Sequence, residues 1–383
     1  MARIVSIIII PMKPGTIPLF RHLTSVPTAP FRETAVAAKA LQWIARHLGR
    51  RVAVKRVRGG LIATYRGAGK APALAVAAHL DHPAFRVETL TKVGAVVRMQ
   101  GRLPPHLLEG VAVEAFTARP EDNRPVARGV LGAALEGEEL WPVTWTQAPA
   151  RGVKPAFLIL ALTPCEVKDG WLSSRSIDDL IGVSMGLEAM RRLAAARAKV
   201  NFTVLMNRAE EVGLVGACEM ALSGVLSPDD SYLSVESSRE LPGSRPGRGP
   251  TIRLGDRASA FDANLIALLD EAAARLRRRG TKVQRLRLTG GTCEGTAYLA
   301  FGFEAAGVAV PLVNYHNGWG AKTIAPERVR VSDVEGGVRL LVEAAKLFPG
   351  KTLRGSMRTR LTRSREGAIA ALEAADTGWK AGR

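Results

Sequence analysis

A continuous apolar run, Ala73-Leu-Ala-Val-Ala-Ala78, leads directly into the polar sequence His79-Leu-Asp81. A strand that is apolar on both faces has to be covered on both faces, so the run predicts a central strand between two layers of helices. After residue 173, strand-like and helix-like segments alternate, which predicts further strands of the same sheet. We therefore expect an α/β fold with a mixed central sheet flanked by helices. The expected helices cover residues 32–48, 179–196, 262–279 and 333–347, with another after Gly213, and the expected strands cover 52–57, 61–65, 73–78, 201–206, 232–235, 283–288 and 307–313.

The pattern of apolar residues, glycine and proline changes between residues 86 and 172. Short alternating runs such as Val111-Ala-Val-Glu-Ala-Phe116 are separated there by glycine and proline, which predicts a small β-rich domain. We expect this domain to be inserted into an α/β domain formed by residues 17–85 and 173–350, followed by a basic C-terminal tail over 351–383. The last helix is expected to begin at Ser332-Asp-Val-Glu335, which has the spacing of a capping box.

Composition argues against a nucleic-acid-binding, a disulfide-rich or a membrane-bound protein. The net charge is +19, but the arginines are spread along the whole chain and aromatic residues make up only 5%, so nucleic-acid binding is not expected as the main function. The three cysteines are far apart, which excludes a disulfide framework and favours a reducing, cytoplasmic compartment. The apolar run that ends at Ile10 is too short to span a bilayer and precedes no cleavage pattern, so no membrane partner is expected.

Side chains that can bind metal ions stand where the expected strands end or a helix begins. In open α/β sheets, ligands collect beyond the carboxyl ends of the strands. Imidazoles and carboxylates at such ends suit a pair of divalent ions that share one carboxylate. Asp81 is placed to accept the second ring N–H of His79. The candidate ligands are His79, Asp178, one member of the pair Glu210 and Glu211, Glu236 and His316.

Each candidate also has an ordinary structural interpretation. His79 could be a core histidine, Asp178 a helix N-cap, Glu236 an ion-pair partner of Arg239, and His316 a loop residue. Their coincidence at strand ends favours a shared site. The adjacent pair Glu210 and Glu211 strengthens this hypothesis, because neighbouring side chains diverge. One carboxylate can bind metal while the other faces the reacting water.

The order of these motifs resembles the M42 metallopeptidases, the glutamyl and deblocking aminopeptidases. The resemblance extends from Leu19 to about Phe348, and its most specific element is Glu210-Glu-Val-Gly-Leu-Val-Gly-Ala217. The other matching elements are His79-Leu-Asp81, Ile177-Asp-Asp-Leu-Ile-Gly182, Val235-Glu236, Gly247-Arg-Gly-Pro250, Gly290-Gly-Thr-Cys-Glu-Gly295 and Tyr315-His316.

The resemblance implies a two-metal aminopeptidase with the zinc-exopeptidase (phosphorylase/hydrolase-like) fold that M42 shares with M20 and M28 peptidases. Asp178 would bridge two ions, with His79 and Glu236 completing one site and Glu211 and His316 the other. Glu210 would be the general base that deprotonates the bridging water, and Asp81 would orient His79. Zinc is the first expectation for the metal, and cobalt or manganese suit the same ligands. The substrate would be a peptide, and relatives form homo-oligomers through the inserted domain.

The chain departs from the family pattern at several positions. His82 and Cys293 stand where a glutamate and an aspartate are common, Glu236 replaces an aspartate, and the usual neighbours of His316 are missing. These changes leave alternatives open. One is an M20-like amidohydrolase or deacylase of acylated amino acids, and another is a non-catalytic binding protein with a basic surface.

Other chemistries are less well supported by the sequence. Cys293 with His316 could form a cysteine-protease pair, and His82 and His106 are extra candidates. M42 sequences have also been labelled endoglucanases, whose reaction needs two carboxylates and no metal. Basic residues between Arg239 and Arg257 suggest a preference for acidic substrate side chains.

Overall fold

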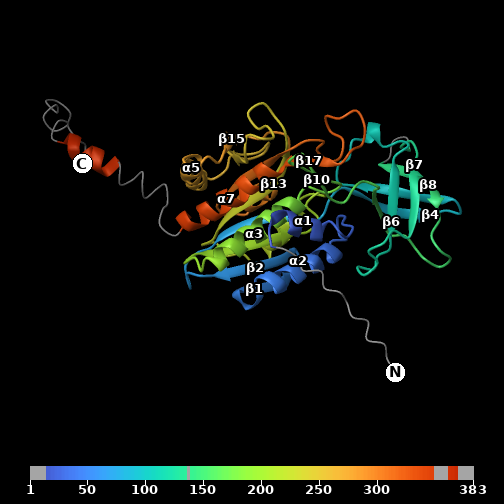
Figure 1. The fold of residues 1–383 in the computed structure, drawn as a ribbon, viewed down its shortest axis with the longest axis horizontal. Coiled ribbons are helices and arrows are strands. Elements are labelled where there is room, and N and C mark those ends of the chain that lie inside the picture. The colour runs from blue at the N-terminus through green and yellow to red at the C-terminus, as the bar shows by residue number, and fades with distance from the viewer. Residues whose placement is uncertain (1–13, 136–138, 349–360, 370–383) are drawn as a thin grey trace, which may run out of the picture.

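Eight strands form one mixed sheet in the main body of the molecule (Figure 1). The computed structural model describes residues 14–135, 139–348 and 361–369. The mixed α/β fold predicted from the sequence is confirmed. In order across the sheet, the strands are β1 (Val52–Val57), β2 (Gly60–Arg66), β12 (Asn201–Asn207), β3 (Leu74–His79), β13 (Ser231–Arg239), β16 (Ala305–Leu312), β14 (Thr251–Arg253) and β15 (Gln284–Leu286).

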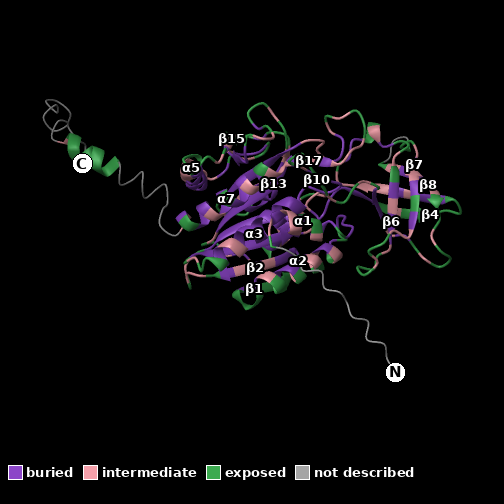
Figure 2. Cartoon of the chain, viewed as in Figure 1, coloured by how far each residue is buried: buried purple, intermediate pink, exposed green. Residues whose placement is uncertain are grey.

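The four middle strands, β12, β3, β13 and β16, run parallel to one another and are buried along nearly their whole length (Figure 2). Alternate residues of β3 face opposite layers, as the period of a strand requires. Leu74 and Val76 join one apolar cluster, and Ala75 and Ala77 join another. This double burial is why the sequence of β3 is continuously apolar.

Helices cover both faces of the sheet. The larger cluster contains buried side chains from five helices, and the smaller cluster contains side chains from two. The first group is α1 (Thr16–Leu23), α2 (Thr34–His47), α3 (Leu180–Ala195), α5 (Ala263–Arg277) and α7 (Val331–Leu347), and the second is α4 (Val215–Leu222) and α6 (Glu294–Ala300). No helix in these described ranges is long and apolar enough to cross a bilayer.

Six antiparallel strands close into a barrel at one end of the molecule (Figure 1). Its interior is filled by side chains such as Phe85, Val97, Trp141 and Leu158. The proposed domain boundaries at residues 86 and 172 stay a prediction. The barrel strands are β4 (Ala84–Leu90), β5 (Gly94–Gln100), β8 (Leu140–Gln147), β7 (Ala127–Leu131), β6 (Ala112–Phe116) and β9 (Phe157–Leu160).

A small antiparallel sheet connects distant parts of the chain. Its strands are β10 (Glu166–Lys168), β11 (Trp171–Ser174) and β17 (Glu327–Arg330). Pairing of β11 with β17 brings the segment before α3 beside the segment before α7. This contact matters for the site described below, because both segments carry residues that lie in it or hold it.

The predicted capping box of the last helix is wrong. Helix α7 begins at Val331, and Ser332 does not cap it. The Glu335 carboxylate instead accepts hydrogen bonds from the Thr16 hydroxyl at 2.9 Å and from the Arg192 guanidinium at 2.7 Å. Glu335 therefore bonds to residues distant in the sequence and does not cap the start of its own helix. The N-terminal apolar run and most of the basic tail lie outside the described residues.

Candidate metal centre

The carboxyl ends of the parallel strands bring the predicted residues to one edge of the sheet. His79 is the last residue of β3, and its strand partner on one side is Asn207 at the end of β12. On the other side, Ser234 of β13 pairs with Ala77, so Glu236 lies level with His79. The sequence suggested that Glu236 follows the end of a strand. In the structure it lies inside β13.

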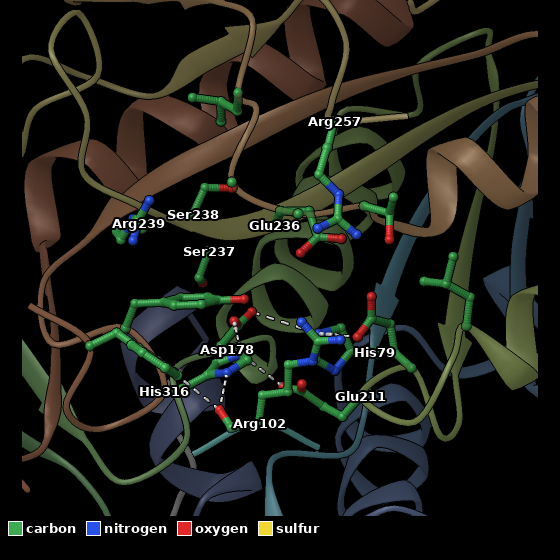
Figure 3. A pocket seen from close by; sticks show the side chains of 18 of the residues that line it. His79, Arg102, Asp178, Glu211, Glu236, Ser237, Ser238, Arg239, Arg257 and His316 are labelled. Atoms are coloured by element: carbon green, nitrogen blue, oxygen red, sulfur yellow. Dashed lines mark hydrogen bonds and ion pairs between the residues drawn. The ribbon is translucent and has the colours of Figure 1, made fainter. Parts of the chain in front are cut away.

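The side chains converge on two groups of three. The first trio is His79, Asp178 and Glu236, and the second trio is Asp178, Glu211 and His316; within each, one ligand atom per residue lies within 4.8 Å of the others. Asp178 lies between the two histidines (Figure 3), with Oδ1 3.6 Å from His79 Nε2 and Oδ2 3.5 Å from His316 Nε2. Glu211 Oε1 is 3.4 Å from His316 Nε2.

These separations fit shared cations better than direct hydrogen bonds. Two ligand atoms bound to one tetrahedral zinc ion are roughly 3.4 Å apart, given bond lengths of about 2.1 Å. Asp178 Oδ1 and Glu211 Oε1 are buried and have no hydrogen-bond partner among the described residues. Buried polar atoms are normally satisfied, so two orphaned carboxylate oxygens that face imidazoles match the donor set of a divalent metal site.

The electrostatics of the site also favour cations. Burial alone would lower the pKa of His79 and His316, but the surrounding carboxylates raise both pKa values well above the usual histidine range. Burial raises the pKa of Glu210 and of Glu236 well above the ordinary glutamate value, and neighbouring carboxylates, Glu294 among them, add to both shifts. Divalent cations would relieve this concentration of negative charge.

Glu210 stands beside both trios without belonging to either. Its Oε2 atom lies 3.9 Å from His79 Nε2, and it forms two further close groups, one with His79 and Glu211 and one with Glu236 and Glu294. The fully buried Glu294 was not singled out from the sequence. Its carboxylate accepts hydrogen bonds from Asn207 Nδ2 at 3.3 Å and from Ser234 Oγ at 3.1 Å.

The turn that presents the two glutamates depends on close backbone packing. At Gly216 a Cβ atom would lie 2.4 Å from the carbonyl oxygen of Arg208, so a side chain has no room there. Gly213 adopts a φ of +113°, which side-chain-bearing residues rarely reach. The glycines of the Glu-Glu-Val-Gly-Leu-Val-Gly element thus allow a tight turn that aims both carboxylates at the sheet edge.

The Asp81 carboxylate anchors this turn. Its carboxylate accepts the backbone N–H groups of Glu210 at 3.0 Å and Glu211 at 3.1 Å. The Asp81 side chain was expected to accept the second ring N–H of His79, but the closer contact is to its backbone. His79 Nδ1 lies 3.1 Å from the backbone oxygen of Asp81 and 3.6 Å from its carboxylate. The residue therefore orients His79 through its backbone and the two glutamates through its side chain.

Glu327 performs a similar task for the other ligands and was missed by the sequence analysis. This fully buried carboxylate accepts N–H groups from Ile177 at 2.8 Å, Asp178 at 3.0 Å and His316 at 2.9 Å. Burial raises its pKa to about 7. It lies eleven residues after His316 at the start of β17, so no local spacing marks it.

Of the extra candidates, His82 contacts the segments that carry the ligands. Its Nδ1 is 2.6 Å from the Asp178 backbone oxygen and its Nε2 is 3.0 Å from Asn317 Oδ1, so it supports the ligand loops. His106 is exposed and packs edge-on against Trp319. The Cys293 thiol lies 3.7 Å from an Asp256 oxygen, and burial raises its pKa to about 11, which does not suit a thiolate nucleophile.

A cavity of about 400 Å³ opens in front of the two trios. The acidic cluster forms one side, and Arg239 and Arg257 lie across from Glu211 (Figure 3). Arg253 also lines the cavity; it is buried, and its Nε has no hydrogen-bond partner among the described residues. Arg102, from the segment after β5, is a further lining residue. The cavity therefore combines a site for cations with a wall that attracts anions.

A family comparison matches this part of the molecule. A model of the M42 glutamyl aminopeptidase family matches residues 146–336, the stretch that contains Asp178, Glu210, Glu211, Glu236 and His316. The chain belongs to the M42 peptidase family. It is accordingly a peptidase of a metal-dependent family, and the two trios are groups that could hold the metal. A search of curated protein sequences finds no match.

Solved structures share the fold of this M42 peptidase at low sequence identity. The TET1 peptidase of Pyrococcus horikoshii is 19% identical with a TM-score of 0.69, and the match covers 86% of this chain and 99% of that chain. An aminopeptidase from Desulfurococcus kamchatkensis is 19% identical (TM-score 0.69; 88% and 95% covered). A TET aminopeptidase from a marine-sediment Thaumarchaeota archaeon is 18% identical (TM-score 0.71; 86% and 96% covered).

The ligand roles can be tested by removing one imidazole. We expect His316→Ala to release at least one metal ion per chain, because the second trio then keeps only two carboxylate ligands. Elemental analysis of purified protein measures this directly. His106→Ala is the control, since that exposed histidine lies outside both trios, and its metal content should equal that of the wild type. Unchanged metal content and affinity in His316→Ala would exclude His316 as a ligand.

Proposed function

We propose that this M42 peptidase is a two-metal aminopeptidase that removes N-terminal residues from peptides. The observation that supports this most is the position of Asp178, whose two oxygens face His79 and His316 and belong to both trios. A pair of divalent cations bound there would polarise the scissile carbonyl and lower the pKa of the attacking water. Zinc suits the mixed imidazole and carboxylate donors, as do cobalt and manganese.

Glu210 is the general base in this proposal. It is close enough to the trios to reach the attacking water, and Asp81 holds its backbone in place. The carboxylate takes a proton from the water and then gives it to the nitrogen of the leaving amine. Burial raises the pKa of Glu210, which moves it toward neutral pH, where a group can both accept and return a proton.

The charge distribution in the cavity supports an exopeptidase. The free ammonium group of an N-terminus is attracted to the acidic side near Glu236 and Glu210, whereas an N-acyl group carries no charge to place there. An M20-like deacylase is the second candidate, since a similar centre would hydrolyse an acylated amino acid. The cavity of about 400 Å³ lies within the usual range for small-ligand sites, so only the end of a peptide is enclosed.

The arginine wall supports a preference for acidic N-terminal residues. Arg239 and Arg257 are exposed and form no ion pair with a carboxylate among the described residues, so their charges are free to pair with a substrate. An acidic side chain placed against them would gain charge-assisted hydrogen bonds. The same wall repels lysine and arginine side chains.

We also propose that the chain assembles with copies of itself, and that the barrel region carries the contact. Solved structures with this fold include a dodecamer and the TET1 peptidase of Pyrococcus horikoshii, which is described as a tetrahedron or a large octahedral shell. The barrel projects from the main body (Figure 1), which leaves its outer surface open to a second chain.

The proposed function can be tested with matched peptides and a chelator. We expect hydrolysis of a short peptide with a free N-terminus, no hydrolysis of its N-acetylated form, loss of activity in EDTA, and recovery on adding zinc, cobalt or manganese. Chromatography of the products measures each rate. Activity only on acylated amino acids would favour the deacylase, turnover of glucans insensitive to EDTA would favour a glycosidase, and no turnover would favour a binding protein.

The role of Glu210 can be tested by an isosteric change. Glu210→Gln should keep its metal but lose turnover by about 10²–10⁴-fold, because an amide cannot accept the proton of the attacking water. The rate constant kcat and the metal content are measured together. Glu219→Gln on α4 is the control, since Glu219 pairs with the exposed Arg58. Wild-type turnover in Glu210→Gln would remove Glu210 from the mechanism.

Substrate preference can be tested by reversing one charge of the wall. Arg257→Glu should lower kcat/KM for glutamyl and aspartyl anilides at least about tenfold relative to leucyl anilide, as expected for a lost charged contact of about 1.5 kcal/mol or more. Arg278→Glu makes the same charge change on the far end of α5 and controls for long-range effects. A panel on which the wild type shows no acidic preference would refute this role of the wall.

A further inference from the structure

Tyr315 is stacked on one of the proposed metal ligands. Its ring lies nearly parallel to the His316 imidazole, with ring centroids 3.8 Å apart and planes 22° apart. Although the two residues are neighbours in the chain, the stacking shows that their rings lie side by side. A phenol ring with its hydroxyl is longer than an imidazole, and Tyr315 lines the cavity in front of the trios. The stacking therefore places the longer Tyr315 side chain beside the His316 imidazole at the wall of this cavity.

The surroundings of the hydroxyl are acidic. Burial raises the pKa of Tyr315 well above its ordinary value, and the carboxylates of Asp178, Glu211, Glu210 and Glu236 raise it further. Tyr315 lines the same cavity as Asp178, Glu210, Glu211 and Glu236. No hydrogen bond from this hydroxyl is formed with the described residues of the chain. It is a neutral donor at the reacting centre, left open toward the cavity.

The serine and imidazole donors beside the carboxylates are already engaged. Ser237 Oγ donates to Asp179 Oδ1 at 3.1 Å, and Ser234 Oγ lies within hydrogen-bond distance of Glu236 and Glu294. The imidazoles belong to the trios, and their Nδ1 atoms contact the backbone oxygens of Asp81 and Arg102. Peptide hydrolysis builds negative charge on the carbonyl oxygen, and a preorganised donor aimed at that charge accelerates the reaction.

We propose that Tyr315 is a catalytic residue whose hydroxyl donates a hydrogen bond to the oxyanion formed at the scissile carbonyl, which rests on the proposed peptidase function. When water adds to the carbonyl carbon, the C=O electron pair moves onto the oxygen. The Tyr315 hydroxyl stabilises that oxygen and keeps its own proton throughout, while Glu210 carries the transferred proton. When the amine leaves, the electron pair returns to re-form the carbonyl and the hydrogen bond weakens.

Tyr315→Phe isolates this hydrogen bond, because phenylalanine preserves the stacking on His316 and removes only the hydroxyl. We expect kcat to fall about 10- to 100-fold, at the lower end of the effect of one oxyanion donor because the cations share the charge. KM and metal content should stay within about twofold of the wild type. Tyr65→Phe is the matched control, since the Tyr65 hydroxyl bonds to the Ala198 carbonyl far from the cavity, and its kcat should be unchanged.

A binding measurement adds a readout that does not depend on turnover. Calorimetry should show that an aminophosphonate mimic of the tetrahedral state binds Tyr315→Phe more weakly by the factor lost in kcat/KM, whereas the product amino acid binds equally well. Wild-type kcat and phosphonate affinity in this variant would overturn the role of Tyr315 and leave the peptidase function intact. Loss of activity together with loss of metal would also overturn it, by showing that Tyr315 only supports His316. A wild-type enzyme without peptidase activity would overturn both proposals.

Discussion

Repulsion among buried carboxylates at one edge of the sheet is the constraint on which the rest of this site depends. Asp178, Glu236 and Glu294 are buried, and Glu210 and Glu211 are half-buried beside them. Charges in such a place are costly unless they are paired or bound to cations. The two histidines reduce the repulsion, and the orphaned oxygens of Asp178 and Glu211 show where it is left unresolved. The fold holds the cluster together against this repulsion.

Two further carboxylates do the holding, and they act on the backbone. Asp81 binds the amides of Glu210 and Glu211, and Glu327 binds those of Ile177, Asp178 and His316. Each of these carboxylates joins segments that are far apart in the chain, so the ligand loops keep their places before any cation arrives. Because metal binding is linked to folding when the ligands come from distant segments, bound cations would stabilise the whole domain.

The cavity carries acidic residues on one side and arginines on another, and in the proposed function this polarity would orient a peptide. The acidic side would attract the ammonium group of an N-terminus, and the wall of Arg239 and Arg257 would attract an anionic side chain. Such an arrangement would make one end of a substrate enter in one direction. Part of the net charge of +19 is thus gathered at the cavity. The even distribution of arginines along the sequence does not reveal this clustering.

The sequence alone determined which segments are buried and where chemistry-bearing residues leave them. The apolar run before His79 corresponds to β3 (Leu74–His79), and each predicted ligand reached the same edge of the sheet, because burial on two faces leaves a pattern in local composition. The partners of those residues depended on tertiary structure. Glu335 accepts hydrogen bonds from Thr16 and Arg192 and does not cap its own helix. Nothing in the sequence around Glu327 indicates that it binds the backbone of Asp178. Strand order and loop contacts join residues hundreds of positions apart, and no spacing between neighbours encodes such pairings.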